Sequence, residues 1–278
     1  MIIMDGKKVR DKILDDVKIK MENNNLEIKL AIIMVGNDET SKIYVKNKEK
    51  ACEYVHIKCD KYLLDESAKE EEVINLINKL NNSDDVTGII LQSPVPIHID
   101  FDKCAGMIKY YKDVDGFTRD NIYSLYMNRE ELIPCTARGI VRLLDEYKID
   151  IEGKHVVIVG RGNIVGKPLS HVLLNRDATV TICHSKTKNL EEICKTADIL
   201  VSAVGKANLI TKEMLKDDAV VIDVGISRVD GKIVGDTNFN EIKDKCSYIT
   251  PVPGGVGPMT VAMIMENLLI AKEMRDNG

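Results

Sequence analysis

The sequence predicts an α/β protein with two domains, each built around a mostly parallel β-sheet. Apolar runs of strand length alternate with helix-length segments along almost all of the 278 residues. These runs are continuous instead of alternating with polar residues, which is typical of parallel strands covered by helices on both faces. The chain is long enough for two domains of ordinary size, and its 44% hydrophobic content is sufficient to bury their cores.

The first half of the chain contains three predicted strands with helices between them. We expect strands at residues 29–36, 57–64 and 86–92, and helices at about 39–55 and 69–82. Each strand is separated from the next by a helix-length segment, as in βαβ units, whose strands run parallel.

The second half repeats this scheme and predicts a second sheet. Its strands are HVVIVG, ATVTIC, ADILVSAVG and AVVIDVG. A polar, turn-rich segment after KDVDGF separates the halves, so the predicted domains are residues 1–118 and 119–258. A last helix at about 259–275 packs either on the second domain or back on the first.

Composition and charge exclude several classes of function. The chain has 39 basic and 44 acidic residues and no basic block interleaved with aromatic residues, so we expect no nucleic-acid partner. Its N-terminus becomes charged after four residues, and no apolar run approaches the roughly 18 residues of a membrane span. We therefore expect a cytoplasmic protein that acts on small molecules and does not bind membranes.

The cysteines and histidines indicate neither a disulfide framework nor a metal site. The seven cysteines are far apart and lack a C-x-x-C pair, and the five histidines do not occur as H-E-x-x-H. We expect reduced thiols and no metal.

A glycine-rich loop follows the first strand of the second half. HVVIVGRGNIVGKP places Gly160, Gly162 and Gly166 between a buried strand and a helix. Glycines in this position allow a tight turn and the close approach of a pyrophosphate to the helix N-terminus. The spacing G-x-G-x-x-x-G is one residue longer than the usual dinucleotide fingerprint, so glycines that only permit a turn are the alternative.

The end of the next strand indicates which dinucleotide this loop binds. Proteins that bind NAD usually carry an Asp or Glu there for the ribose 2′-hydroxyl, but ATVTICHSKT has none. Donors and positive charge replace it, which favours the 2′-phosphate of NADP. The candidate cofactor-binding residues are Gly160, Arg161, Gly162, Ile164, Val165, Gly166, His184, Ser185 and Gly205.

A predicted helix near the N-terminus holds four lysines on two different faces. Lys48 shares an apolar stripe with Tyr44, while Lys42, Lys46 and Lys50 lie on the opposite, solvated side. A lysine on an apolar stripe extends to solvent, pairs with an acid or lines a cleft. Tyr44 and Lys48 also form the Y-x-x-x-K pair of short-chain dehydrogenases. In that family the pair lies far downstream of the glycine loop, whereas here it precedes the loop, so the order excludes this family.

Gln92 and the KDVDGF segment supply further polar groups. Gln92 ends a buried strand, at the edge where ligands bind in open α/β sheets. The segment KDVDGF supplies Asp113 and Asp115, although an ordinary Asp-Gly turn explains this motif equally well.

A loop with three glycines, PVPGGVGPMT, precedes the last helix. It contains Gly254 and Gly255 and predicts Pro258 at the first helical position. Its bare backbone either binds a ligand carbonyl or anion, or acts as a simple hinge.

Nine motifs follow one another along the chain from about residue 5 to about residue 267. They are VGNDETSKIYVKNK, GIILQSPVP, KDVDGF, PCTARG, GRGNIVGKP, CHSKT, ADILVSAVGKA, VVIDVGI and PVPGGVGPMT. In this order they closely resemble bifunctional methylenetetrahydrofolate dehydrogenase/methenyltetrahydrofolate cyclohydrolase. The resemblance implies an N-terminal α/β domain and a Rossmann-type NADP domain with a folate cleft between them, in a homodimer. It also implies that the C-terminal helix, residues 259–278, packs back on the first domain.

The resemblance implies an activity and a set of site residues. The activity is NADP-dependent oxidation of 5,10-methylenetetrahydrofolate to the 5,10-methenyl form and its hydrolysis to 10-formyltetrahydrofolate, so tetrahydrofolate derivatives are the implied partners. The matching positions are the catalytic Lys48, its supporting Gln92, the stacking Tyr44, the pterin-binding Asp115, the folate-contacting Gly254 and Gly255, and Arg161 and Ser185 near the 2′-phosphate. The chain departs from the family pattern at Ser93, Ala137, Gly162, Asn238 and His56.

Two alternatives to this function stay open at the level of sequence. A dehydrogenase of the shikimate type also combines a small α/β domain that carries a lysine and an aspartate with a Rossmann domain, and it acts on a hydroxy acid. A non-catalytic NADP-sensing protein would keep the fold without turnover.

Overall fold

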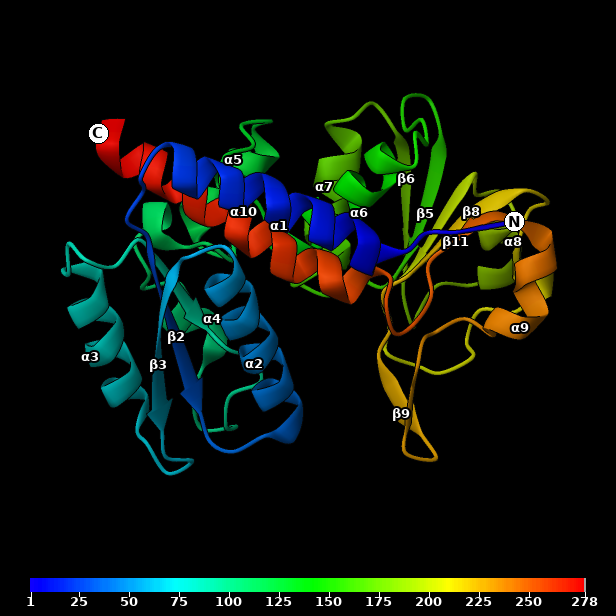
Figure 1. Cartoon of the computed structure of the whole chain (residues 1–278). Helices are drawn as coiled ribbons and strands as arrows, with labels where there is room; N and C mark the ends of the chain where they lie inside the picture. The colour runs from blue at the N-terminus through cyan, green and yellow to red at the C-terminus, as the bar shows by residue number, and fades with distance from the viewer. Residues whose placement is uncertain (278) are drawn as a thin grey trace. The chain divides into compact units, whose positions relative to one another are not determined.

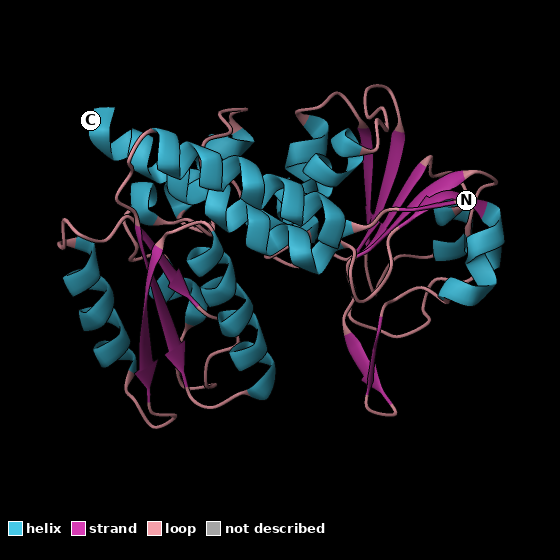
Figure 2. Cartoon of the chain, viewed as in Figure 1, coloured by secondary structure: helices cyan, strands magenta, loops and turns pink. Residues whose placement is uncertain are grey.

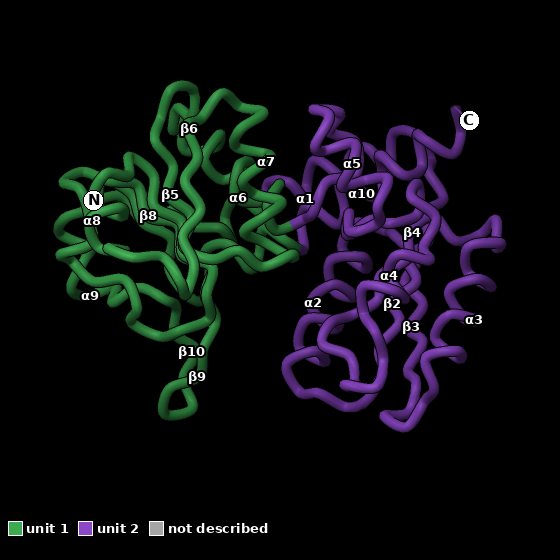
Figure 3. The backbone as a smooth tube through the Cα atoms, turned by 180° about the vertical axis from the view of Figure 1, so that it is seen from behind, with its two compact units in different colours: residues 1–10, 136–260 green, residues 11–135, 261–278 purple. Residues whose placement is uncertain are grey.

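The computed structural model describes residues 1–277, which form two compact units. Unit 1 contains residues 1–10 and 136–260, and unit 2 contains residues 11–135 and 261–277 (Figure 3). The two-domain α/β fold predicted from the sequence is thereby confirmed, with a parallel sheet in each unit.

Unit 2 is a small α/β unit with a parallel three-stranded sheet in the order β3-β2-β4. Its strands are β2 (Lys29–Val35), β3 (Lys58–Leu64) and β4 (Gly88–Leu91). Its helices are most of α1 (Gly6–Asn23), α2 (Glu39–Tyr54), α3 (Glu70–Asn81), α4 (Phe101–Ala105), the 3-10 turn η1 (Tyr110–Lys112), α5 (Arg119–Tyr126) and most of α10 (Val256–Asn277). The strands and the helices α2 and α3 begin and end within two residues of their predicted positions.

Helices cover both faces of this sheet, as its continuous apolar strands require. Ala31, Ile33 and Val35 of β2 pack with Val73 and Ile77 of α3 in one core cluster. Figure 1 shows α2 and α3 on opposite sides of β2 and β3. Both neighbours of β2 run parallel to it, so the carboxyl ends of the three strands lie at one edge.

Helix α10 packs closely on β4 and begins earlier than predicted. A Cβ atom on Gly88 would lie 2.6 Å from side-chain atoms of Leu268 and Val114, so the helix leaves room only for glycine at this position of β4. The prediction that Pro258 is the first helical residue is wrong, because α10 begins at Val256. Proline is tolerated at the third position as well, since the N–H groups of the first turn have no acceptor within the helix.

The segment after residue 118 differs from the turn-rich linker that the sequence predicts. Residues 119–126 form α5, and Nδ2 of Asn121 donates hydrogen bonds to Oδ2 of Asp113 and to the carbonyl oxygen of Tyr110, both at 2.9 Å. These bonds attach α5 to unit 2. The structure therefore divides the chain after Cys135, whereas the sequence predicts a division after residue 118.

Unit 1 contains a six-stranded sheet in the order β1-β11-β8-β7-β5-β6, in which every neighbouring pair is parallel. Its strands are β1 (Ile2–Ile3), β5 (His155–Val159), β6 (Thr179–Cys183), β7 (Ile199–Ser202), β8 (Ala219–Asp223) and β11 (Cys246–Ile249). A separate antiparallel hairpin consists of β9 (Ser227–Val229) and β10 (Lys232–Val234). Figure 2 shows the strands of the large sheet side by side and this hairpin apart from them.

The core of unit 1 lies between this sheet and short helices. Its helical elements are α6 (Cys135–Glu146), α7 (Gly166–Leu174), α8 (Leu190–Cys194), the 3-10 turn η2 (Lys212–Met214), α9 (Phe239–Ile242) and the 3-10 turn η3 (Lys243–Lys245). Val157 of β5 and Leu200 of β7 pack with Cys194 of α8 and Ile242 of α9 in one buried cluster. The loops that follow β5, β6, β7 and β8 all leave the same edge of the sheet, because these strands are parallel.

In the described residues, no helix is long and apolar enough to cross a membrane, and no group of His, Cys, Asp or Glu side chains is arranged to hold a metal ion.

Candidate active site

Lys48 and Gln92 are in direct contact inside unit 2. Both side chains are buried, and Nζ of Lys48 donates a hydrogen bond of 2.9 Å to Oε1 of Gln92. Nε2 of Gln92 donates to the carbonyl oxygen of Ser93 at 2.7 Å. Because the amide nitrogen is engaged there, the amide oxygen is the atom that faces the lysine. The buried lysine thus has a neutral acceptor at its amine.

Local sequence explains why α2 presents Lys48 to the interior. Oδ1 of Asp38 accepts a hydrogen bond of 2.7 Å from the backbone N–H of Ser41 and caps the helix, which fixes where its first turn begins. Ser41, Val45 and Lys48 then follow at helical spacing on the buried face. Tyr44 lies half-buried one turn before Lys48, and burial raises the pKa of its hydroxyl.

The two aspartates of KDVDGF have different surroundings. Asp113 is buried and accepts hydrogen bonds from the backbone N–H groups of Gly116 and Thr118 and from Nδ2 of Asn121, at 2.9, 2.7 and 2.9 Å. It therefore builds the turn. Asp115 takes no part in these bonds and is half-buried, and it interacts electrostatically with Lys48. Burial raises the pKa of Asp115, and the charge of Lys48 and a hydrogen bond from Cys135 oppose this rise.

Helix α10 supports the loop that carries Asp115. Asn267 is completely buried, and its Nδ2 donates to the carbonyl oxygens of Val114 and Ile133 at 3.0 and 3.2 Å. The predicted site residues do not include Asn267. A polar side chain close to the long apolar runs of this helix was the available signal, since such a group needs partners when it is buried.

The glycine loop of unit 1 has two positions where only glycine fits. Gly160 has φ +130°, and a Cβ atom on it would lie 2.4 Å from the carbonyl oxygen of Ala203. A Cβ atom on Gly166 would lie 2.1 Å from the carbonyl oxygen of Gly160. Gly162 has open space around it. Gly160 and Gly166 thus bring bare backbone to the start of α7, which is the cradle that a dinucleotide pyrophosphate needs.

The end of β6 lies directly beside this loop. The backbone N–H of Gly160 donates to the carbonyl oxygen of Cys183 at 2.9 Å. His184 is half-buried, and Arg161, Ser185 and Lys186 are exposed. This segment from Cys183 to Lys188 contains no acidic residue, so its basic and hydroxyl groups fit a 2′-phosphate. The other two predicted contacts in the loop are the exposed Ile164 and the half-buried Val165, which precedes α7.

Gly254 and Gly255 belong to unit 1, together with the predicted cofactor residues. Gly254 has φ +114°, and its carbonyl oxygen accepts a hydrogen bond of 2.9 Å from the backbone N–H of Gly6. A Cβ atom on Gly255 would lie 2.7 Å from the carbonyl oxygen of Pro251. The predicted residues Lys48, Tyr44, Gln92 and Asp115 belong to unit 2.

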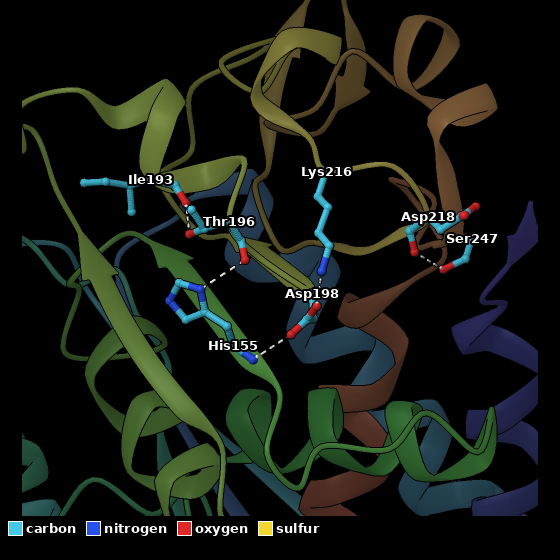
Figure 4. Close-up of polar contacts among 7 residues, drawn as sticks. All are labelled: His155, Ile193, Thr196, Asp198, Lys216, Asp218 and Ser247. Carbon is cyan, nitrogen blue, oxygen red and sulfur yellow. Dashed lines mark hydrogen bonds and ion pairs between the residues drawn. The ribbon is translucent and has the colours of Figure 1, made fainter.

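A recess of about 380 Å³ lies at the other edge of the large sheet, where β7 and β8 begin. Two of its charged groups are paired with each other: Nζ of Lys216 lies 2.5 Å from Oδ1 of Asp198, whose Oδ2 accepts a hydrogen bond from the backbone N–H of His155 at 2.9 Å (Figure 4). Paired groups at the amino ends of parallel strands are not typical of a ligand site.

The predicted site residues also do not include two buried aspartates of unit 1, Asp223 and Asp236. Asp223 ends β8, and Asp236 follows the β9–β10 hairpin. An acidic residue at the end of an apolar strand was the signal in each of the segments VVIDVG and IVGD.

Models of two domains from one family match nearly the whole chain. The tetrahydrofolate dehydrogenase/cyclohydrolase catalytic domain matches residues 4–115, and the NAD(P)-binding domain of the same family matches residues 134–276. A relative from Clostridium novyi, named bifunctional protein FolD, is 52% identical and covers 96% of this chain and 98% of its own length. Another FolD protein, from Campylobacter concisus, is 47% identical over 99% of both.

Solved structures agree with these relatives. The bifunctional methylenetetrahydrofolate dehydrogenase/cyclohydrolase of Campylobacter jejuni is 46% identical, with a TM-score of 0.96 and coverage of 99% of both chains. The enzyme of Trypanosoma brucei, solved with NADP and an inhibitor, is 33% identical with a TM-score of 0.94, covering 100% of this chain and 99% of its own.

A shikimate dehydrogenase from Aquifex aeolicus is similar in fold alone. It is 12% identical, with a TM-score of 0.56 over 88% of this chain and 97% of its own. The family models and the closely similar sequences, in contrast, agree along almost the full length. The chain belongs to the tetrahydrofolate dehydrogenase/cyclohydrolase family.

Proposed function

We propose that Lys48, held by Gln92, is the general acid and base of this bifunctional enzyme. The chain oxidises 5,10-methylenetetrahydrofolate to 5,10-methenyltetrahydrofolate with NADP and hydrolyses the product to 10-formyltetrahydrofolate, two reactions of one-carbon metabolism. The single observation that supports the role of Lys48 is its buried contact of 2.9 Å with the neutral oxygen of Gln92.

Asp115 and Tyr44 are proposed to bind the substrate. A pterin ring offers an edge of paired N–H donors, and a carboxylate accepts these in two parallel hydrogen bonds. Asp115 is suited to this role because its neighbour Asp113 already satisfies the N–H groups of the turn. The half-buried ring of Tyr44 offers an apolar face to the aminobenzoyl group. The backbone at Gly254 and Gly255 is proposed to lie against the folate.

The oxidation requires alignment more than it requires a protein acid or base. NADP, when bound, accepts the hydride from the methylene carbon. The proposed contacts that orient it are the glycine loop with Gly160, Gly162, Ile164, Val165 and Gly166, the strand end with His184 and Ser185, the charge of Arg161, and Gly205 after β7.

The hydrolysis needs a group that moves protons. As water adds to the methenyl carbon, Lys48 takes a proton from it, and the amine returns a proton to the ring nitrogen when the C–N bond breaks. Gln92 supports this cycle because its oxygen holds the amine without a negative charge. A carboxylate in its place would form an ion pair that retains the lysine's proton.

We further propose that unit 2, with Lys48, Gln92, Tyr44 and Asp115, carries the catalytic and pterin-binding side chains and that unit 1 binds NADP. A homodimer in the cytoplasm is the proposed state of the enzyme. Sedimentation of the purified protein at several concentrations tests the dimer, and a constant monomer mass would contradict it.

A two-step assay of the purified protein tests the function. With methylenetetrahydrofolate and NADP, we expect NADPH to form first and the methenyl intermediate to decay afterwards, with lower activity on NAD. If no NADPH forms, the function is wrong. Turnover of a hydroxy acid without any activity on folate would favour the shikimate type. Binding of NADP without turnover of any folate would favour a sensing protein.

A further inference from the structure

Asp236 fixes the loop that follows β7. Its side chain is completely buried and accepts four hydrogen bonds. The donors are Oγ of Ser202 at 2.8 Å and the backbone N–H groups of Val204, Gly205 and Lys206 at 2.8, 3.3 and 2.7 Å. One carboxylate thus holds three consecutive peptide groups.

A second buried carboxylate fixes Asp236 in turn. Asp223 accepts hydrogen bonds from the backbone N–H groups of Asp236, Thr237 and Gly225 at 2.9, 2.8 and 3.0 Å, and from Oγ1 of Thr237 at 2.7 Å. A Cβ atom on Gly225 would lie 2.0 Å from Oδ1 of Asp236, and one on Gly235 would lie 2.1 Å from Oδ2 of Asp223. The two carboxylates therefore have almost no freedom to move.

The direction of the three N–H groups determines the direction of the carbonyl groups before them. In a planar trans peptide the N–H of one residue points opposite to the C=O of the preceding residue. The carbonyl oxygens of Ala203, Val204 and Gly205 must therefore point away from Asp236. The structure shows this for Ala203, whose carbonyl oxygen lies against Gly160 of the glycine loop.

We infer that Asp236 is a positioning residue for the cofactor. By holding the N–H groups of residues 204–206 inward, it turns the carbonyl oxygens of Val204 and Gly205 outward at the carboxyl edge of the sheet, next to the glycine loop. Outward carbonyl oxygens accept hydrogen bonds from ribose hydroxyls or from the carboxamide of a nicotinamide. Asp236 itself, fully buried, acts only through the loop. The inference rests on the NADP-dependent function proposed above.

The substitution Asp236→Asn tests the inference. A carboxylate has two acceptor oxygens, whereas an amide has only one. The NH₂ group of the amide is itself a donor, so it cannot accept a hydrogen bond from the backbone N–H groups that face it. The loop loses at least one of its bonds and the carbonyl oxygens lose their fixed direction. We expect the Kd for NADP, measured by titration calorimetry, to rise at least about tenfold. Hydrolysis of added methenyltetrahydrofolate without NADP should stay within about twofold of the wild type.

Two further variants separate positioning from simple loss of stability. Ser202→Ala removes one donor and leaves the carboxylate intact, so the Kd for NADP should rise about three- to tenfold. Asp198→Asn is the matched control, because Asp198 accepts a backbone hydrogen bond from His155 at the opposite end of the same sheet (Figure 4). It should lower stability and leave the Kd for NADP unchanged.

Several results would overturn the inference. One is wild-type affinity for NADP in folded Asp236→Asn, and another is an equal loss of NADP binding and methenyl hydrolysis in that variant. If Asp236→Asn does not fold, wild-type affinity for NADP in Ser202→Ala would overturn the inference instead. The titration of the wild-type protein with NADP comes first. If the wild type binds no NADP, the proposed function itself is wrong; if it binds NADP, a failure in the variants concerns only the role of Asp236.

Discussion

Lys48 differs from its neighbouring lysines in what it contacts. Lys42 pairs with Glu39 at 2.6 Å, and Lys46 and Lys50 are exposed, whereas Lys48 is buried against Gln92. The hydrogen-bond acceptor at this buried amine is the neutral amide oxygen of Gln92, which suits the proton transfer proposed for Lys48. In the proposed mechanism, the hydrolysis therefore depends on Gln92 as much as on Lys48.

Replacement of Gln92 by glutamate should suppress hydrolysis. In Gln92→Glu the carboxylate would pair with the ammonium group of Lys48 and retain its proton, so methenyl hydrolysis should fall about 100-fold. NADPH formation at saturating substrate should fall much less. Stopped-flow measurement of both steps checks this, with Gln92→Met as a control that is uncharged and similar in size. Equal rates of hydrolysis in Gln92→Glu and wild type would contradict the proposed role.

Protonation of Asp115 should weaken folate binding at acid pH, which would appear as an acid limb in the pH profile of the folate KM. In the proposed role its carboxylate form accepts the pterin donors, and burial raises its pKa. As pH falls through this raised pKa the carboxylate is protonated, so folate affinity is present above the pKa and lost below it. The folate KM should begin to rise at a higher pH than an exposed aspartate would produce. In Asp115→Asn the KM should be about 10- to 100-fold higher and no longer show this limb.

The same raised pKa has a consequence for stability. A carboxyl group whose pKa is higher in the folded than in the unfolded protein makes folding less favourable as the pH rises above the unfolded pKa, and this loss of stability is complete above the folded pKa. Asp115→Asn should therefore unfold at no lower temperature than the wild type at neutral pH. The control is Asp120→Asn at an exposed position, which should change neither KM nor stability. A folate KM that is unchanged in Asp115→Asn would remove Asp115 from substrate binding.

The sequence predicts some of these residues and not others for a physical reason. Lys48 stands out because its helix places it among apolar residues, a pattern within one element. The burial of Asp223 and Asp236 depends on contacts between segments that meet only in the fold. Oδ2 of Asp236, for example, accepts a hydrogen bond from Ser202, 34 positions earlier. Burial of such a group cannot be derived from the periodicity of its own segment.

At the scale of elements, α10 holds the KDVDGF loop in place through Asn267. Its amide satisfies the carbonyl oxygens of Val114 and Ile133 within the core of unit 2. Since Val114 directly precedes Asp115, this contact determines how the loop presents the carboxylate. The helical pattern predicts this helix, and the family resemblance implies the domain on which it packs, but neither identifies the carbonyl groups that Asn267 contacts, because a helical pattern shows only which face is apolar.

Replacement of Asn267 by leucine should destabilise the protein and loosen the loop. Asn267→Leu leaves two buried carbonyl oxygens without this donor, which we expect to lower the free energy of unfolding by about 1–3 kcal/mol. The folate KM should rise as well. Urea unfolding and steady-state kinetics check both, with the exposed Glu273→Gln on the same helix as the control. An unchanged free energy of unfolding would show that Asn267 does not support the loop.

Two elements, β1 and α5, form where the local sequence pattern does not predict them. Strands with continuous apolar runs were predicted closely, but β1 contains only two residues, Ile2 and Ile3, too few for any pattern. It forms because β11 offers a parallel partner. Helix α5 lies in a segment that reads as polar and turn-rich, and it is held to unit 2 by Asn121.

At the scale of the whole molecule, one chain combines two chemistries with different requirements. The oxidation depends on alignment of substrate and NADP, and the hydrolysis depends on a proton carrier. If Lys48 serves only the hydrolysis, a single substitution at Lys48 should separate the two activities. Order along the chain also matters at this scale, because the position of Lys48 before Gly160 is what excludes a short-chain dehydrogenase.

The most direct test is the two-step assay on Lys48→Met, with the exposed Lys46→Met as a matched control on the same helix. Loss of the amine should slow decay of the methenyl species by about 100- to 10,000-fold, while folate still binds and the control behaves like the wild type. Decay at the wild-type rate in Lys48→Met would contradict the account, because it would remove Lys48 from the hydrolysis.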